Sequence, residues 1–112
     1  MPYLARLAVR PRVELKLYPQ ASVRQHRDLR AFVRYSIDQI ERAAGSMWWT
    51  VTIAPTGVCY ACEVTVERAG RITRATGDGF DAAVAGRNAF IQIEKLLRAN
   101  RARFKEVARV AR

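Results

Sequence analysis

Hydrophobic and polar residues alternate along four segments of this chain, as they do in strands that bury one face. In the first segment Val13, Leu15 and Leu17 alternate with polar or charged residues. Two turn sequences, residues 55–57 (Pro-Thr-Gly) and 69–70 (Ala-Gly), separate the other three segments from one another. The alternation therefore predicts strands over residues 13–18, 47–54, 58–68 and 71–76.

Two further segments have the period of an amphipathic helix. Residues 27–44 are followed by Gly45, which stands where a helix commonly ends. Residues 78–112 contain no proline, and Asp78 is expected to be the N-cap of a helix, with Asp81 three residues later in the position of a capping-box acid. The pattern predicts a helix over each segment. The apolar stripe of the first consists of Leu29, Phe32, Val33, Ile37, Ile40 and Ala44.

The predicted elements follow one another in the order β-α-β-β-β-α. Such an order favours an α+β fold of two layers, a four-stranded sheet with both helices packed on one face, as in double-stranded-RNA-binding domains. Residues 1–12 contain Pro2 and Pro11 and are expected to form a basic N-terminal arm. Residues 13–112 are expected to form a single folded domain.

The composition indicates a polyanionic partner. The formal net charge is +10, from 20 lysine and arginine residues against 10 acidic ones, and 17 of the 20 are arginine. Nucleic acid is the commonest polyanion and arginine binds phosphate in a bidentate manner, although arginine-rich coding alone could produce the same composition. No apolar run reaches membrane-spanning length and residues 1–12 do not resemble a signal peptide, so we expect a cytoplasmic protein without a membrane partner.

Residues capable of catalysis or metal binding are few. Cys59 and Cys62 lie three apart on a predicted strand, so their side chains point to opposite faces of the sheet. His26 is the only histidine, which leaves too few ligands for a zinc site. We therefore expect no enzymatic activity, no metal, no cofactor and no small-molecule substrate.

Two rows of basic residues at helical spacing are the strongest functional signal. Either row alone could be an ordinary solvated face. If both helices cover the same face of the sheet, however, their outer surfaces would form one basic platform suited to RNA phosphates. The candidate RNA-binding residues are Arg27, Arg30 and Arg34 in the first helix and Lys95, Arg98, Arg101, Arg103, Lys105 and Arg109 in the last.

Four short runs, together with the order of the elements, resemble one known family. Residues 28–33 (Asp-Leu-Arg-Ala-Phe-Val) open the first predicted helix, and Ile40-Glu41 lies near its end. Residues 77–84 (Gly-Asp-Gly-Phe-Asp-Ala-Ala-Val) begin the last helical segment, and residues 93–98 (Ile-Glu-Lys-Leu-Leu-Arg) lie within it. These runs resemble the ribosome hibernation-promoting factors, also called ribosome-associated inhibitors or sigma-54 modulation proteins.

The resemblance implies a function in translation. Family members bind the small ribosomal subunit near the decoding centre and inhibit translation in stationary or stressed cells. The chain has neither the additional C-terminal domain of the long form nor an acidic tail, so it resembles the short form. The basic positions that match the family are Arg30, Lys95 and Arg98.

The last helix departs from the family's spacing. Its two matching runs lie about three residues further apart, which rotates the second run by roughly 60° around the helix axis on a period of 3.6 residues per turn. We therefore predict a bend or irregular turn at residues 86–88 (Gly-Arg-Asn).

Two alternative functions remain open at this point. One is a generic basic module that binds RNA other than the ribosome's. The other is a structural protein that forms a homodimer through the open face of its sheet, which would carry Trp48 and Cys59.

Overall fold

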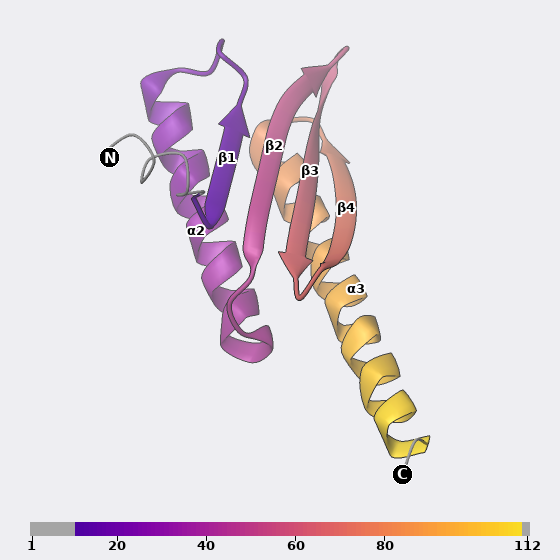
Figure 1. Ribbon diagram of the computed structural model, residues 1–112. Helices are drawn as coiled ribbons and strands as arrows, with labels where there is room; N and C mark the ends of the chain where they lie inside the picture. Colours follow the sequence, from indigo (N-terminus) through magenta and orange to yellow (C-terminus); the bar gives the residue numbers. More distant parts are fainter. Residues whose placement is uncertain (1–10, 111–112) are drawn as a thin grey trace, which may run out of the picture.

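The computed structural model describes the backbone of residues 11–110 and the side chains of residues 11–101. It contains four strands and two helices in the predicted order, as Figure 1 shows. The elements are β1 (Val13–Leu17), α2 (Val23–Ala44), β2 (Trp48–Thr56), β3 (Cys59–Arg68), β4 (Arg71–Gly79) and α3 (Ala82–Val110).

The strands form one sheet in the order β1-β2-β3-β4. β1 runs parallel to β2 and is joined to it by α2, whereas the β2–β3 and β3–β4 pairs are antiparallel hairpins. The Ala69-Gly70 turn lies between β3 and β4 as predicted. Both of its residues have positive φ, 51° and 78°, as a two-residue hairpin turn requires.

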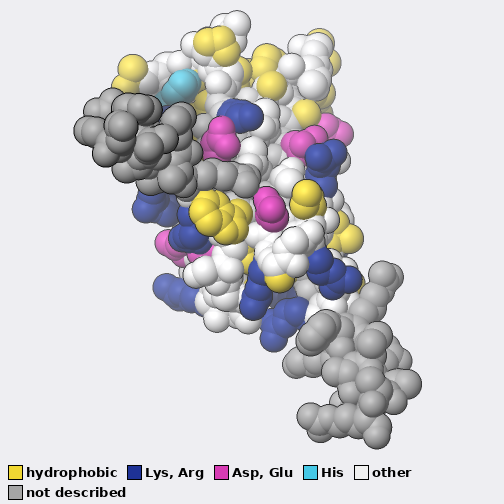
Figure 2. Space-filling view, in the orientation of Figure 1, with side chains coloured by type: hydrophobic (Ala, Val, Ile, Leu, Met, Phe, Trp, Pro, Cys, Tyr) yellow, Lys and Arg dark blue, Asp and Glu magenta, His cyan; other side chains and the backbone are white. Residues whose placement is uncertain are grey.

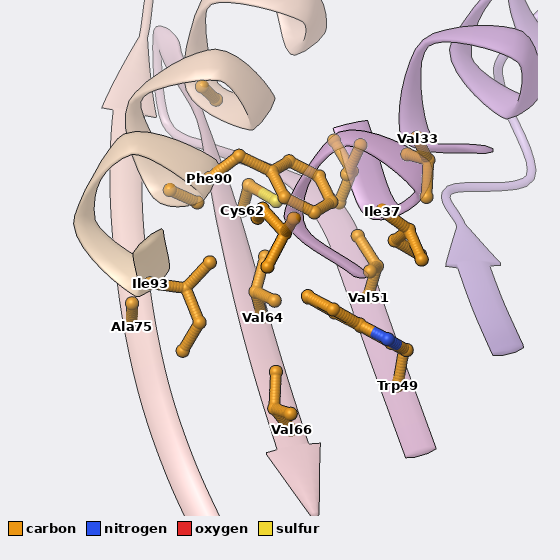
Figure 3. Close-up of a cluster of buried hydrophobic side chains, with 14 of the residues drawn as sticks. Val33, Ile37, Trp49, Val51, Cys62, Val64, Val66, Ala75, Phe90 and Ile93 are labelled. Carbon is orange, nitrogen blue, oxygen red and sulfur yellow. The ribbon is translucent and has the colours of Figure 1, made fainter. Parts of the chain in front are cut away.

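Both helices cover the same face of the sheet, which confirms the predicted two-layer α+β fold. The inward residues of β2 and β3 are those that the alternation predicts, and they pack against α2 and α3 (Figure 3). The largest fully buried side chains are Trp49, Ile37, Ile53, Ile93, Val33, Val51, Val64, Val66 and Cys62. Neither α2 nor α3 lies on the other face of the sheet, so its outward residues are more exposed.

The first helix begins earlier than predicted, at Val23 and not at residue 27. Ser22 is its N-cap and forms a capping box with Gln25: Ser22 Oγ accepts from Gln25 N at 3.1 Å, and Gln25 Oε1 accepts from Ser22 N at 2.8 Å. This reciprocal pair satisfies two backbone groups, so the first turn is stable although its residues lie outside the apolar stripe.

The β2–β3 turn also differs from the prediction, since β2 continues through Pro55 to Thr56 and the turn is Gly57-Val58. Proline removes a hydrogen-bond donor, which usually disrupts a central strand. Here β1 pairs with β2 only as far as Ile53, so the nitrogen of Pro55 has no partner strand on that side.

The last helix begins at Ala82 and is capped by Asp81, whose Oδ1 accepts from Val84 N at 2.9 Å. The prediction that Asp78 is the N-cap is therefore wrong. Asp78 belongs to β4, where it pairs with Ala61, because this strand is three residues longer than its apolar pattern indicates.

Glycine residues in β4 allow α3 to approach the sheet closely. A Cβ atom at Gly77 would lie 2.3 Å from Ala89 N and 2.7 Å from Ala85 O, both atoms of the α3 backbone. Gly79 is equally constrained, 2.6 Å from Ala85 N. Side chains at these positions would force the helix away from the strand, so glycine is required for the contact.

The irregular turn predicted at residues 86–88 is absent, and α3 is continuous through them. Gly86 is buried against α2, where a Cβ would lie 3.2 Å from the ring of Phe32. Asn88, a polar residue in the apolar stripe, donates from Nδ2 to Asp78 O at 2.7 Å. Both residues that appeared to interrupt the helix therefore serve its packing.

One carboxylate connects the end of α2 to the start of β2. Glu41 Oε2 accepts hydrogen bonds from Met47 N at 2.9 Å and Trp49 Nε1 at 3.0 Å, and it also forms an ion pair with Arg12. Arg12 O in turn accepts from Trp49 N at 2.8 Å. Arg12 is thus bound to the folded domain, while residues 1–10 of the predicted arm lie outside the described residues.

Candidate nucleic-acid interface

The three candidate residues of the first helix lie exposed along α2. Arg27 has only a distant, solvent-exposed ion pair with Asp28, at 3.9 Å. Arg30 and Arg34 line a shallow hollow together with Val13 and Leu15 of β1. This row therefore flanks the edge of the sheet that β1 forms.

Three candidates lie in the part of α3 whose side chains are described. Lys95 is exposed, and Arg98 is held by an ion pair with Glu94, one helical turn earlier. Arg101 NH1 donates to Ala43 O of α2 at 3.1 Å. The side chains of Arg103, Lys105 and Arg109 lie outside the described part, although the α3 backbone runs through all three positions.

Over the residues whose side chains are described, the structure does not bring the two rows together into one platform. Phe32 of α2 faces α3, since its ring meets that of Phe90 edge-on with centroids 6.1 Å apart. Arg30 and Arg34 lie two residues before and after Phe32, which places each about 160° around the helix axis from it. The α2 row therefore points away from α3, and the two rows present separate basic surfaces.

A second group of arginines gathers where α2 ends. Arg68 donates to Ala44 O, and with Arg71 and Arg101 it lines a hollow at this end of the two layers. Figure 2 shows Lys and Arg side chains collected towards the lower end of the molecule, where α2 ends and the β3–β4 turn lies. Arg68 and Arg71 were not predicted as binding residues, because they lie on strands and the predicted basic rows lie on helices. Their positions on either side of the Ala69-Gly70 turn were the available signal.

Charge differs in sign between the two layers. In α2, and in α3 as far as residue 101, nine lysine and arginine residues stand against four carboxylates. On the open face of the sheet, the strand residues with side chains directed outwards include four carboxylates and only two cations. The cations of the helix layer are Arg24, Arg27, Arg30, Arg34, Arg42, Arg87, Lys95, Arg98 and Arg101. A polyanion is therefore attracted to the helix layer and not to the open face of the sheet.

The cysteines and the histidine lie in settings that give them no evident catalytic partner among the described residues. Burial raises the pKa of the Cys62 thiol to about 12, with a smaller contribution from the nearby charge of Glu63. Its thiol therefore stays protonated at neutral pH, whereas a cysteine nucleophile reacts as the thiolate. His26 lies in the first turn of α2, with Nε2 3.3 Å from Tyr18 O.

The fold and the charge distribution together define the class: a small two-layer α+β domain with a mixed sheet and a cationic helix layer. Among the described residues, no helix is both long enough and apolar enough to cross a membrane. No protein-family model matches the sequence, and no curated protein sequence matches it either.

Solved structures of two proteins share this fold. The N-terminal domain of Protein Y from Thermus thermophilus aligns with a TM-score of 0.64 and 16% sequence identity, over 75% of this chain and 91% of that domain. A ribosomal subunit interface protein from Coxiella burnetii aligns with a TM-score of 0.69 and 12% identity, over 80% of this chain and 97% of that protein. At these identities the likeness is one of fold. It agrees with the two-layer α+β architecture predicted from the order of the elements.

Proposed function

We propose that this protein binds ribosomal RNA of the small ribosomal subunit through its helix layer and thereby inhibits translation. The observation that carries the proposal is the cation excess of the helix layer, nine cations against four carboxylates up to residue 101. A protein with the same fold is, by its name, a ribosomal subunit interface protein. The positions of Arg30, Lys95 and Arg98 also match basic positions of the hibernation-promoting factors.

Binding of this kind depends mainly on phosphate contacts. Guanidinium groups bind phosphate oxygens in pairs, and release of counterions from the RNA drives association. Side chains cannot enter the deep, narrow major groove of A-form RNA, so the shape of the RNA and not its base sequence would select the site. A site near the decoding centre would exclude messenger RNA, which explains how binding alone could inhibit translation.

Charge-reversal variants of the helix layer test the proposal. We expect Lys95→Glu/Arg98→Glu, and separately Arg30→Glu/Arg34→Glu, to abolish co-sedimentation with small subunits and inhibition of translation in vitro. None of these residues is buried, so the variants are expected to stay folded. Arg101 is left unchanged because it also caps the end of α2.

A matched control carries the same change of net charge on the other layer. Lys16 and Arg74 are exposed cations of the open sheet face, and Lys16→Glu/Arg74→Glu is expected to leave co-sedimentation unchanged. Equal loss of binding in this control and in the helix variants would contradict an interface on the helix layer. Equal affinity of the unaltered protein for plain duplex RNA and for small subunits would favour a generic RNA-binding module.

A further inference from the structure

A hollow of about 600 Å³ separates the two layers at the end of the molecule where α2 stops. α3 continues past this point, as Figure 1 shows. The hollow is lined by α3 on one side, and by the end of β3 and the start of β4 on the other. We call it the end pocket. Its described lining residues are Ala43, Ala44, Gly45, Met47, Val66, Arg68, Ala69, Arg71, Thr73, Leu97, Asn100 and Arg101.

The lining of the end pocket combines positive charge with an apolar floor. Its three charged side chains are all arginines, and none of its described lining residues is acidic. Met47, Val66 and Leu97 supply apolar surface beside them. A ligand that matches this lining has an anionic group and a body that packs against aliphatic side chains.

Two of the three arginines are held in place by the protein. Arg68 donates to Ala44 O and Arg101 donates to Ala43 O, which are carbonyl groups at the C-terminus of α2. A guanidinium group has five N–H donors, so each retains donors for a ligand after this bond. The backbone of Arg71 pairs with Arg68 of β3, but its side chain forms no hydrogen bond or ion pair with any described residue. The site thus has two fixed cations and one that is available to close on an anion.

A pair of polar side chains completes the lining. Asn100 Nδ2 lies 3.4 Å from Thr73 Oγ1, and both residues border the pocket. An amide and a hydroxyl together supply both donors and acceptors, which are the groups that recognise the edge of a nucleobase. The volume lies within the usual range of small-molecule sites, roughly 300–1,000 Å³.

We propose that the end pocket binds a nucleoside 5′-phosphate. Its phosphate would contact Arg71 with Arg68 and Arg101, and its base would lie on the apolar floor beside Asn100. The ligand is either a free nucleotide or an unpaired nucleotide of an RNA strand, which share this chemistry. Of the three arginines of the end pocket, Arg101 also belongs to the basic row of α3, whereas Arg68 and Arg71 lie outside both rows. The proposal therefore goes beyond RNA binding by those rows.

Calorimetric titration of the full chain tests the proposal, with AMP, UMP, inorganic phosphate and a single-stranded RNA hexanucleotide as probes. The informative variant is Arg71→Met, because the side chain of Arg71 forms no polar contact with a described residue and its loss should not unfold the protein. Its control is Arg74→Met, an exposed arginine on the same strand whose side chain points to the open face. We expect Arg71→Met to weaken nucleotide binding about tenfold or more, and Arg74→Met to change it less than about twofold.

The outcomes separate the two sources of the ligand. Saturable binding of AMP or UMP supports a free nucleotide, whereas binding of the hexanucleotide alone supports an unpaired nucleotide within RNA. The proposal is overturned if no probe binds saturably, if phosphate binds as tightly as the nucleotides, or if Arg74→Met weakens binding as much as Arg71→Met. Because Arg71 lies outside both rows, co-sedimentation of Arg71→Met with ribosomal subunits reports on the helix layer independently.

Discussion

At the scale of single residues, the carboxylate of Glu41 is the polar group on which most contacts converge among the described side chains. Only 12% of its side chain is exposed, and it accepts from Met47 N, Trp49 Nε1 and Arg12. Burial by itself would raise the pKa of this carboxyl, but the hydrogen bonds and the charge of Arg12 outweigh it and lower the pKa. The ionised form is thus the one that stabilises the fold.

Glu41→Gln is expected to lower the free energy of unfolding at pH 7 by about 1.5–3 kcal/mol, the usual worth of hydrogen bonds to a charged group. Because the folded-state pKa is depressed, the contribution of Glu41 is complete above the unfolded-state pKa of about 4.3 and is lost as pH falls through the folded-state value. The difference between the two proteins should therefore shrink below about pH 4.5 in urea titrations. A difference that stays constant down to about pH 3 would contradict this role, since the other carboxylates are common to both proteins.

Gly77 illustrates a constraint of space. A Cβ at this position would meet the backbone of α3 at 2.3 Å, and helix backbone cannot move aside as a flexible side chain can. We expect Gly77→Ala to destabilise the domain by roughly 1–3 kcal/mol through overpacking. Thr76→Ala, on the neighbouring outward-facing position of β4, is the control and should cost less than about 1 kcal/mol. Equal unfolding free energies for both variants would show that α3 can shift without cost.

At the scale of elements, the direction of each basic row is set by its helix. Arg30 and Arg34 point away from α3, and Arg98 forms an exposed ion pair with Glu94 on α3 itself. Because the two rows point in different directions, each row is expected to protect a different segment of ribosomal RNA. Hydroxyl-radical footprinting of the Arg30→Glu/Arg34→Glu and Lys95→Glu/Arg98→Glu variants checks this. At a protein concentration high enough for each variant to bind in part, the two variants should lose protection of different nucleotides. Loss of protection at the same nucleotides in both would refute separate surfaces.

Strand faces and helix existence were predictable from the sequence because burial repeats every two or about 3.6 residues. The residues at which the helices and strands begin and end were less predictable. The start of α2 depends on the capping box of Ser22 and Gln25. The end of β4 depends on Gly77 and Gly79, which are needed because the backbone of α3 packs closely against them. Apolar periodicity does not report either effect.

The candidate site was predictable in part. Spacing identified the basic rows, but not the angle between them, because that depends on which side of α2 meets α3. Arg101 was predicted only as an RNA-binding residue, although its side chain also donates to Ala43 O, 58 residues earlier in the chain. Arg68 caps the same helix end from β3. Contacts between such distant positions arise from the tertiary fold and leave no local pattern.

At the scale of the whole molecule, the two layers differ in charge. The open face carries the carboxylates of Glu14, Glu63, Glu67 and Asp78. It also carries partly exposed apolar side chains, with Trp48 41% and Ile72 66% exposed. This face would repel phosphates while the helix layer attracts them. The charge distribution would therefore turn the helix layer towards an approaching polyanion. The dimer considered from the sequence would use this open face and would leave the helix layer free.

Salt dependence measures how many phosphates the helix layer neutralises. The logarithm of the binding constant falls linearly with the logarithm of salt concentration, with a slope of about −0.7 to −0.9 per phosphate contacted. Lys95→Gln/Arg98→Gln is expected to reduce the magnitude of that slope by roughly 1.5, because two phosphate contacts are removed. Lys16→Gln/Arg74→Gln removes the same net charge from the open face and should leave the slope unchanged. Fluorescence anisotropy with a labelled fragment of small-subunit RNA, between about 50 and 200 mM salt, provides the measurement. If both variants change the slope equally, only the total charge of the protein matters, and the orientation inferred from its two layers is wrong.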